Sequence, residues 1–217
     1  MTAYDLYLRA FALSFAWERS ATIRSLELLE QAIERDPHYG SALTQAAARH
    51  FELHVNGWTN DPETSRRKGI ELSRQALQAA GDDPNVLSIV AYILGYFGEE
   101  IEVAIALLNR GLELNPSSAR GWQWSGWLRA WTGQPDLAIK HFETSLRLNP
   151  REQRANPLMG IGVPTSSLDG WRKPGRRCWG HCKKSRIGSP PTDFLRPATR
   201  IWVVLTRRVK LSSSYAV

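Results

Sequence analysis

The chain has 217 residues, of which 42% are hydrophobic and 23% are charged, and its formal net charge is +7. This composition suits a globular protein with a hydrophobic core rather than a disordered chain. No run of 18 apolar residues predicts a membrane span, and the only cysteines, Cys178 and Cys182, exclude a disulfide scaffold for the residues that precede them.

The charge is divided unevenly along the chain. Residues 164–217 carry 12 Lys and Arg against two acids, Asp169 and Asp193, a balance of +10. Residues 1–163 carry 16 basic and 19 acidic residues, a balance of −3. The change near Val163 predicts two regions of different character. Because residues 1–163 lack cysteine and the N-terminus lacks a secretory signal pattern, we expect a cytoplasmic protein.

The first predicted element is a helix over residues 2–17, where apolar residues recur at helical spacing. Four later segments repeat one pattern, an amphipathic helix that ends at a proline, and the last two prolines, Pro116 and Pro150, are 34 residues apart. A fixed period of this kind predicts an array of helical hairpins. The segments are LELLEQAIERDP (26–37), IELSRQALQAAGDDP (70–84), AIALLNRGLELNP (104–116) and AIKHFETSLRLNP (138–150).

One unit of the array is longer than the others. Ala32 and Ala76 occupy equivalent positions but are 44 residues apart, ten more than the period. The intervening stretch HVNGWTNDPET (54–64) contains Asn-Gly and Asp-Pro, which are turn signals. The sequence therefore predicts an enlarged loop here, between the two helices of the second unit.

The last two units resemble the tetratricopeptide repeat, a 34-residue helix–turn–helix unit. The final unit departs from the pattern at Ser125 and Arg129. The resemblance implies an all-α, right-handed α-solenoid over residues 1–163, with about four units and a stub of a fifth at 160–163. Its matching positions place a large side chain opposite small ones and a glycine after the first helix. They are Trp122, Gly126, Gly133, Ala138, Phe142, Ser145 and Pro150.

In tetratricopeptide arrays the first helix of each unit lines a concave groove, so the resemblance implies a module that binds a protein or peptide. Trp127 and Trp131 are four residues apart and share a helix face. The alternative for these residues is ordinary packing between helices, and the oligomeric state stays open. The candidate partner-binding residues are Ile89, Ile93, Tyr96, Arg120, Gln123, Trp127 and Trp131.

No enzymatic, metal or cofactor site is predicted. His50 and His54 are four residues apart on a predicted helix, but a third ligand is not evident and Glu does not follow the first histidine directly. We therefore expect two partly exposed helix histidines rather than a metal site. Neither a glycine-rich phosphate loop nor a nucleophile elbow is present, so we name no catalytic residue.

The tail, residues 164–217, has three interpretations: a basic disordered extension, a nucleic-acid-binding segment, or the same repeat translated in the wrong reading frame. If ancestral codons began one base earlier, every codon that now starts with T overlies a codon with T in the middle, which encodes an apolar residue. This restores a helical spacing of apolar positions, and we favour a frameshifted, unstructured tail without a nucleic-acid role. The forced positions are Trp171, Cys178, Trp179, Cys182, Phe194 and Trp202.

Residues 1–163 also resemble one larger family. TAYDLYLRA, HVNGWTNDPE, RRKGIELSRQAL and GWQWSGWLRAW are similar to the C-terminal repeat region of bacterial class III adenylate/guanylate cyclase–tetratricopeptide proteins, and similar regions follow winged-helix regulators. The resemblance covers no catalytic domain, so it implies no cyclase activity. It leaves a second interpretation open, in which the chain is a truncated, non-catalytic remnant of such a signalling or regulatory protein.

Overall fold

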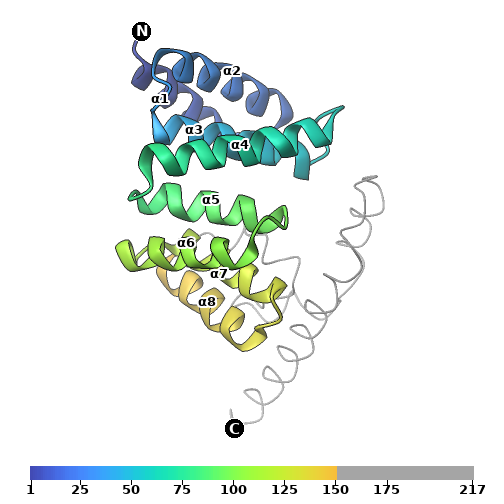
Figure 1. Cartoon of the computed structure of the whole chain (residues 1–217), viewed down its shortest axis with the longest axis vertical. Coiled ribbons are helices and arrows are strands. Elements are labelled where there is room, and N and C mark those ends of the chain that lie inside the picture. Colours follow the sequence, from blue (N-terminus) through green and yellow to red (C-terminus); the bar gives the residue numbers. More distant parts are fainter. Residues whose placement is uncertain (151–217) are drawn as a thin grey trace. The chain divides into compact units, whose positions relative to one another are not determined.

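The structure, a computed structural model, describes residues 1–150 (Figure 1). These residues form eight α-helices and no strand, which confirms the predicted all-α fold. The predicted fifth-unit stub and the predicted frameshifted tail lie outside the described residues. The helices are α1 (Ala3–Leu13), α2 (Arg19–Arg35), α3 (Gly40–Val55), α4 (Pro62–Ala80), α5 (Pro84–Tyr96), α6 (Ile101–Leu114), α7 (Ala119–Trp131) and α8 (Pro135–Leu148).

Consecutive helices pair into hairpins, and the chain divides into two compact units. The first unit, Met1–Pro116, contains the hairpins α1/α2, α3/α4 and α5/α6. The second unit begins at Ser117, and its described part is the hairpin α7/α8. Within the first unit each hairpin also packs on the next, α2 against α3 and α4 against α5. The predicted helix–turn–helix organisation is therefore confirmed.

Side-chain caps fix the starts of three first helices. Thr2 begins α1 in a capping box, in which its backbone N–H donates to the Asp5 carboxylate over 2.7 Å. Asp83 accepts a backbone N–H over 2.7 Å at the start of α5, and Ser118 accepts one over 3.1 Å at the start of α7. Such caps satisfy N–H groups that have no partner inside the helix, so each of these helices begins at a defined residue.

The crossing of α7 and α8 depends on one large and one small residue. Phe142 of α8 is buried against Gly126 of α7, where an added Cβ would lie only 2.5 Å from the phenyl ring. Ala138 and Ser145, one turn before and after Phe142, are buried as well. Gly133 follows α7 with a φ of +74°, which favours glycine. All five residues behave as the repeat pattern predicts.

The first unit uses the same kind of close crossing. A Cβ at Gly111 of α6 would lie 2.8 Å from the Ser88 Oγ of α5, and the Ser25 hydroxyl of α2 donates to the Ala10 carbonyl of α1 over 2.9 Å. Small residues thus bring the two helices of each hairpin close together. Six buried side chains from α1, α2 and α3 form one cluster between the first two hairpins: Leu6, Ala10, Leu29, Ala32, Ala42 and Ala46.

The prediction of an enlarged loop over residues 54–64 is wrong. The connection between α3 and α4 runs over 56–61, only slightly longer than the connection over 97–100 between α5 and α6. The surplus residues lie mainly in the helices, because α3 and α4 have 16 and 19 residues whereas α5 and α6 have 13 and 14. Asp61 and Pro62 are the N-cap and first residue of α4, so the Asp-Pro pair starts a helix rather than extending a loop.

We expect Phe142→Ala to lower the free energy of unfolding by about 3–5 kcal/mol, because it leaves a cavity beside Gly126 that the backbone cannot fill. Chemical denaturation followed by circular dichroism measures this change. The matched control is Leu137→Ala on the same helix, whose side chain is exposed and whose loss should change stability by less than about 0.5 kcal/mol. Equal effects of the two changes would contradict the assignment of Phe142 as the main contact of the hairpin.

Candidate binding face

The first helices of the four hairpins can be compared in one register, counted from their N-cap residues Thr2, Tyr39, Asp83 and Ser118. Positions 2, 6, 9 and 13 after the N-cap follow a spacing of four, three and four residues, which places helical side chains on one helix face. In α1 the last of these positions, Phe15, lies in the turn after the helix, which ends at Leu13. None of the sixteen side chains at these positions is buried, and we call each set of four an open row. The open rows are Tyr4, Leu8, Phe11 and Phe15; Ser41, Gln45, Ala48 and Glu52; Asn85, Ile89, Tyr92 and Tyr96; and Arg120, Trp124, Trp127 and Trp131.

A neighbouring row, at positions 3, 7 and 10, is buried in three of these helices. In α3 its members Ala42 and Ala46 belong to the same core cluster as Leu29 and Ala32 of α2, the helix that precedes α3. In α3, one row therefore packs against the preceding helix while the open row stays accessible. The buried rows are Ala42, Ala46 and Arg49; Val86, Val90 and Ile93; and Gly121, Ser125 and Leu128.

The predicted candidates on α5 divide between the two rows. Ile89 and Tyr96 lie in the open row, whereas Ile93 lies in the buried row and is 1% exposed. Tyr92, which the sequence analysis did not single out, takes the place in the open row between them. Helical spacing alone fits both rows, because they are offset by one residue, and only the N-cap at Asp83 distinguishes them.

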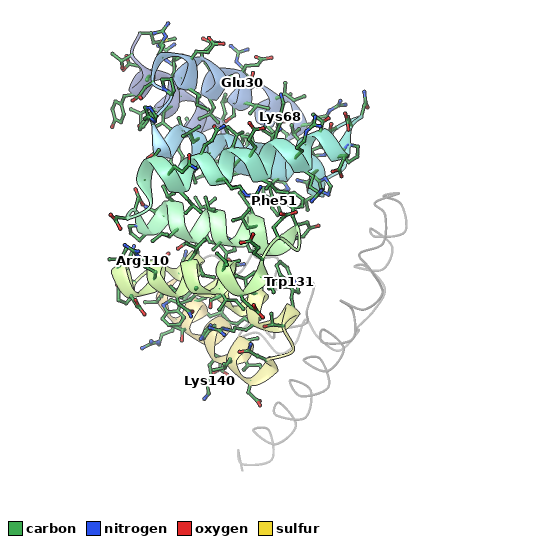
Figure 2. The ribbon with its side chains drawn as sticks, viewed as in Figure 1. Glu30, Phe51, Lys68, Arg110, Trp131 and Lys140 are labelled. Carbon is green, nitrogen blue, oxygen red and sulfur yellow. The ribbon has the colours of Figure 1, made fainter. Side chains whose placement is uncertain are left out.

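The open row of α5 is backed by aromatic side chains. The ring of Phe51 on α3 (labelled in Figure 2) lies edge-on to Tyr92, with centroids 5.5 Å apart, and edge-on to Tyr96 at 5.0 Å. Phe97, directly after α5, adds a third ring at 5.9 Å from Phe51. Burial raises the pKa of the Tyr92 and Tyr96 hydroxyls, so both stay protonated.

The predicted candidates on α7 fall mostly in its open row. Arg120, Trp127 and Trp131 (Trp131 is labelled in Figure 2) belong to it, whereas Gln123 is 6% exposed and lies beside it. Trp124 completes the row and was missed because the sequence analysis weighed only the pair four residues apart. The helical spacing of Trp124, Trp127 and Trp131, at i, i+3 and i+7, is the signal that would have found it.

The open row of α7 forms a connected aromatic surface. The Arg120 guanidinium lies over the Trp124 ring at 5.9 Å from its centroid, and the Trp127 and Trp131 rings are 6.1 Å apart. Trp127 also contacts the buried ring of Phe142 edge-on at 5.7 Å, so the hairpin core holds it in place. Its buried indole N–H finds no acceptor among the described residues.

The two histidines on α3 differ from the expectation of two partly exposed side chains. His50 is buried and its Nδ1 has no hydrogen-bond partner within the described residues, so the prediction is wrong for His50. At the α3/α4 crossing, a Cβ added at Gly69 of α4 would lie 3.7 Å from the His50 Cβ and 3.6 Å from the Phe97 ring. His54 is partly exposed, and its Nδ1 lies 2.9 Å from the Pro62 carbonyl oxygen, which accepts a hydrogen bond from it.

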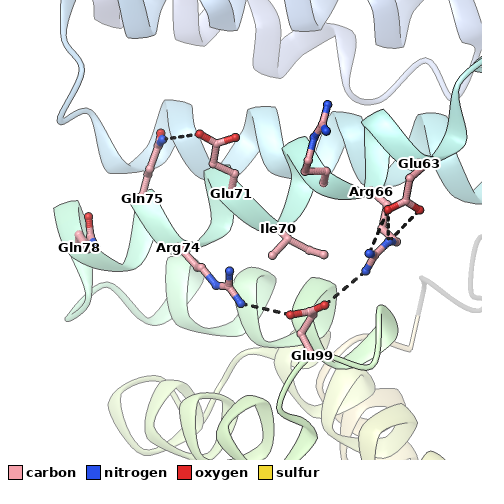
Figure 3. Close-up of a pocket in the computed structure, with 9 residues that line it drawn as sticks. Glu63, Arg66, Ile70, Glu71, Arg74, Gln75, Gln78 and Glu99 are labelled. Carbon is pink, nitrogen blue, oxygen red and sulfur yellow. Dashed lines mark hydrogen bonds and ion pairs between the residues drawn. The ribbon is translucent and has the colours of Figure 1, made fainter.

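A surface pocket of about 380 Å³ lies along α4 and the connection between α5 and α6 (Figure 3). The Glu99 carboxylate accepts hydrogen bonds there from Arg66 over 3.3 Å and Arg74 over 3.2 Å, and Arg66 is also paired with Glu63 over 3.0 Å. The ion pairs of Glu99 with Arg66 and Arg74 therefore connect the α5–α6 connection to α4. The sequence analysis singled out none of its basic residues.

The described residues contain no group of three or more His, Cys, Asp or Glu side chains that could hold a metal ion. Across residues 1–150, none of the helices is both long and apolar enough to cross a membrane.

No model of a known protein family matches the sequence, and no curated protein matches it. Among solved structures, the chain is similar to TTC0263, a thermophilic TPR protein in Thermus thermophilus, with 15% identity, a TM-score of 0.60, and coverage of 71% of this chain and 77% of that one. It is also similar to PilF of Pseudomonas aeruginosa, with 25% identity, a TM-score of 0.52, and coverage of 68% of this chain and 62% of that one. The fold is therefore that of tetratricopeptide-repeat proteins, as the sequence pattern predicts.

We expect the stability of the protein to fall as the pH drops from about 6.5 to about 4, the interval set by His50. Burial, and to a smaller extent repulsion from Lys68, lowers the pKa of His50 from 6.5 to about 4 in the folded chain. The unfolded chain binds a proton in this interval that the folded chain does not, so the stabilisation is complete above the upper pKa and is lost towards the lower one, by up to ~3 kcal/mol.

Denaturation curves at a series of pH values test this expectation in the wild-type chain and in His50→Leu. The substitution should remove the His50 part of the slope, leaving the part that comes from His141, whose pKa is lowered by burial and by Arg129. The control His38→Gln changes an exposed histidine and should keep the full slope. An unchanged slope in His50→Leu would contradict the prediction.

Proposed function

We propose that this protein is a protein–protein interaction module that binds a peptide or a partner domain on the open rows of α5 and α7. The observation that carries the proposal is the α7 row of Arg120, Trp124, Trp127 and Trp131, an accessible aromatic surface with a cation at one end. Tryptophan, tyrosine and arginine are the residue types that supply most of the binding energy at protein interfaces.

The α7 row is ordered before any partner arrives. Trp127 is fixed by its contact with Phe142, and Trp131 stands against Trp127. A preordered aromatic surface loses little side-chain entropy on binding, which raises the affinity that the contact area can deliver.

The α5 row supplies a second contact surface, in the first unit. It combines the aliphatic side chain of Ile89 with the phenol rings of Tyr92 and Tyr96, which Phe51 supports from α3. Aliphatic and aromatic side chains of this kind suit a partner that presents apolar side chains. The proposal includes no catalytic, metal or cofactor role, and we propose a cytoplasmic location because residues 1–163 lack cysteine.

We expect Trp124→Ala and Trp131→Ala each to weaken binding of the partner by about 30-fold or more, as loss of a dominant interface residue does. The full chain serves as bait in an extract of its source cells, and titration calorimetry then measures the affinity for the purified partner.

The matched control is Trp58→Ala, which removes a partly accessible tryptophan from the α3–α4 connection, outside every open row. Binding by this variant should equal that of the wild type. If the α7 variants lose stability but bind normally, the tryptophans serve packing between helices and the assignment of the binding face fails.

A second candidate is a truncated, non-catalytic remnant of a cyclase-type or winged-helix regulator, with a repeat array over residues 1–163 and a frameshifted tail over 164–217. The resemblance of segments such as GWQWSGWLRAW supports it, as does the charge of the tail. The nucleotide sequence tests it in two places: coding sequence for either domain upstream of Met1, and an open frame one base earlier across codons 155–217. A closed frame there would refute the frameshift.

A further inference from the structure

The α1/α2 hairpin carries a concentration of exposed apolar side chains. Four of them form the open row of α1, Tyr4, Leu8, Phe11 and Phe15, and Trp17 follows in the turn after it. Their exposure runs from 38% for Phe11 to 73% for Phe15. We call these five residues the N-terminal aromatic patch. The next open row, on α3, consists of polar or small residues, so the patch is distinct from the rows used in the proposed function.

The backbone at Trp17 gives a second, independent sign that this patch has a role. Trp17 has a φ of +45° and lies 15 residues after the N-cap of α1. Gly98 and Gly133 occupy the same position after their own N-caps, both with a φ of +74°. A left-handed residue with a side chain is strained, and glycine is the default there. Because the Trp17 side chain is 68% exposed, it buries little surface in the fold, and backbone strain of this kind is typical of functional sites.

The spacing of the patch suits another helix as its occupant. Tyr4, Leu8 and Phe11 recur after four and three residues along α1, the spacing of a seam along which two helices pack side by side, and Phe15 extends this seam from the turn after the helix. The seam is held rigid by ring contacts, since Phe11 stacks with Tyr7 at 6.0 Å and lies edge-on to Phe15 at 5.3 Å. A rigid apolar seam loses little entropy when a partner helix covers it.

A second copy of α1 in antiparallel orientation complements this seam. Leu8 of one copy then meets Phe11 of the other, and Tyr4 lies towards the turn that carries Phe15, so the facing side chains are apolar. Beside the seam, Asp5 lies opposite the partner copy's Ala12 rather than its own equivalent, so the two-fold pairing brings no like charges together.

The area is sufficient for a stable pair. At about 200 Å² for a large side chain, the exposed parts of the five patch residues amount to roughly 550 Å² per copy. Two copies together bury about 1,100 Å², which exceeds the ~1,000 Å² that a specific interface needs.

We propose that the N-terminal aromatic patch is a homodimer interface, on which a second copy of this chain docks through antiparallel packing of α1 on α1. The inference does not depend on the proposed function, because the open rows of α5 and α7 take no part in the dimer.

Sedimentation equilibrium of the full chain over the micromolar range tests the proposal. The wild type should form dimers, and Leu8→Asp should raise the dissociation constant at least tenfold because it places a charge inside the seam. The control Leu114→Asp, on an equally exposed leucine of α6, should leave the dimer intact. A wild type that stays monomeric at every concentration overturns the proposal, whether or not another protein binds the patch, and so does equal dissociation by both variants.

Trp17→Gly separates association from folding. Glycine relieves the strained backbone, so the thermal midpoint of the variant measured under monomeric conditions should not fall below that of the wild type. The dissociation constant of its dimer should nevertheless be several-fold higher than that of the wild-type dimer. A variant that keeps full dimer affinity overturns the inclusion of Trp17, and a lowered midpoint shows that Trp17 serves folding instead.

Discussion

The close approach of the two helices in each hairpin is the contact on which the rest of this structure depends. Gly126 lets the Phe142 ring reach the backbone of α7, and Gly111 admits α5 to α6 in the same way. Once a first helix is packed against its second helix, the direction in which its buried row (positions 3, 7 and 10 after the N-cap) points is fixed too. In α3 and α5 that row packs towards the preceding helix, and the residues left over form the open row. The accessible face thus consists of the residues that pack neither against the second helix of the hairpin nor against the preceding helix.

Sequence reasoning found the hairpins because their determinants are residue types that a pattern exposes. Large Phe142, small Ala138 and Ser145, and left-handed Gly133 each occupy a position with one physical solution. The length of the α3/α4 hairpin was not predictable in this way, because Asp-Pro serves equally well as a loop signal and as a helix start. The extra length of both helices is evident only in the structure, where α3 packs along α4.

The candidate face was predictable in part, for a related reason. Buried and open rows differ by a shift of one residue, so Ile93 and Tyr92 are indistinguishable by helical period alone. To assign residues to the open or the buried row, the exact N-cap must be known. Asp83 is the N-cap of α5, but several polar residues of that turn could cap a helix, so the sequence alone does not identify it. His50 was misjudged because the residues that enclose it come from α4, far along the chain, where no local pattern signals them.

The longer α3/α4 hairpin has a practical consequence. Its connection over 56–61 reaches beyond the α5–α6 connection (Figure 1), and its exposed residues Gly57 and Asn60 belong to no open row. Exposed tips of this kind accept inserted sequence with little effect on the rest of a domain. A fluorescent protein or an epitope inserted between Gly57 and Asn60 would show where the protein lies in cells and would leave the residues of the open rows unchanged.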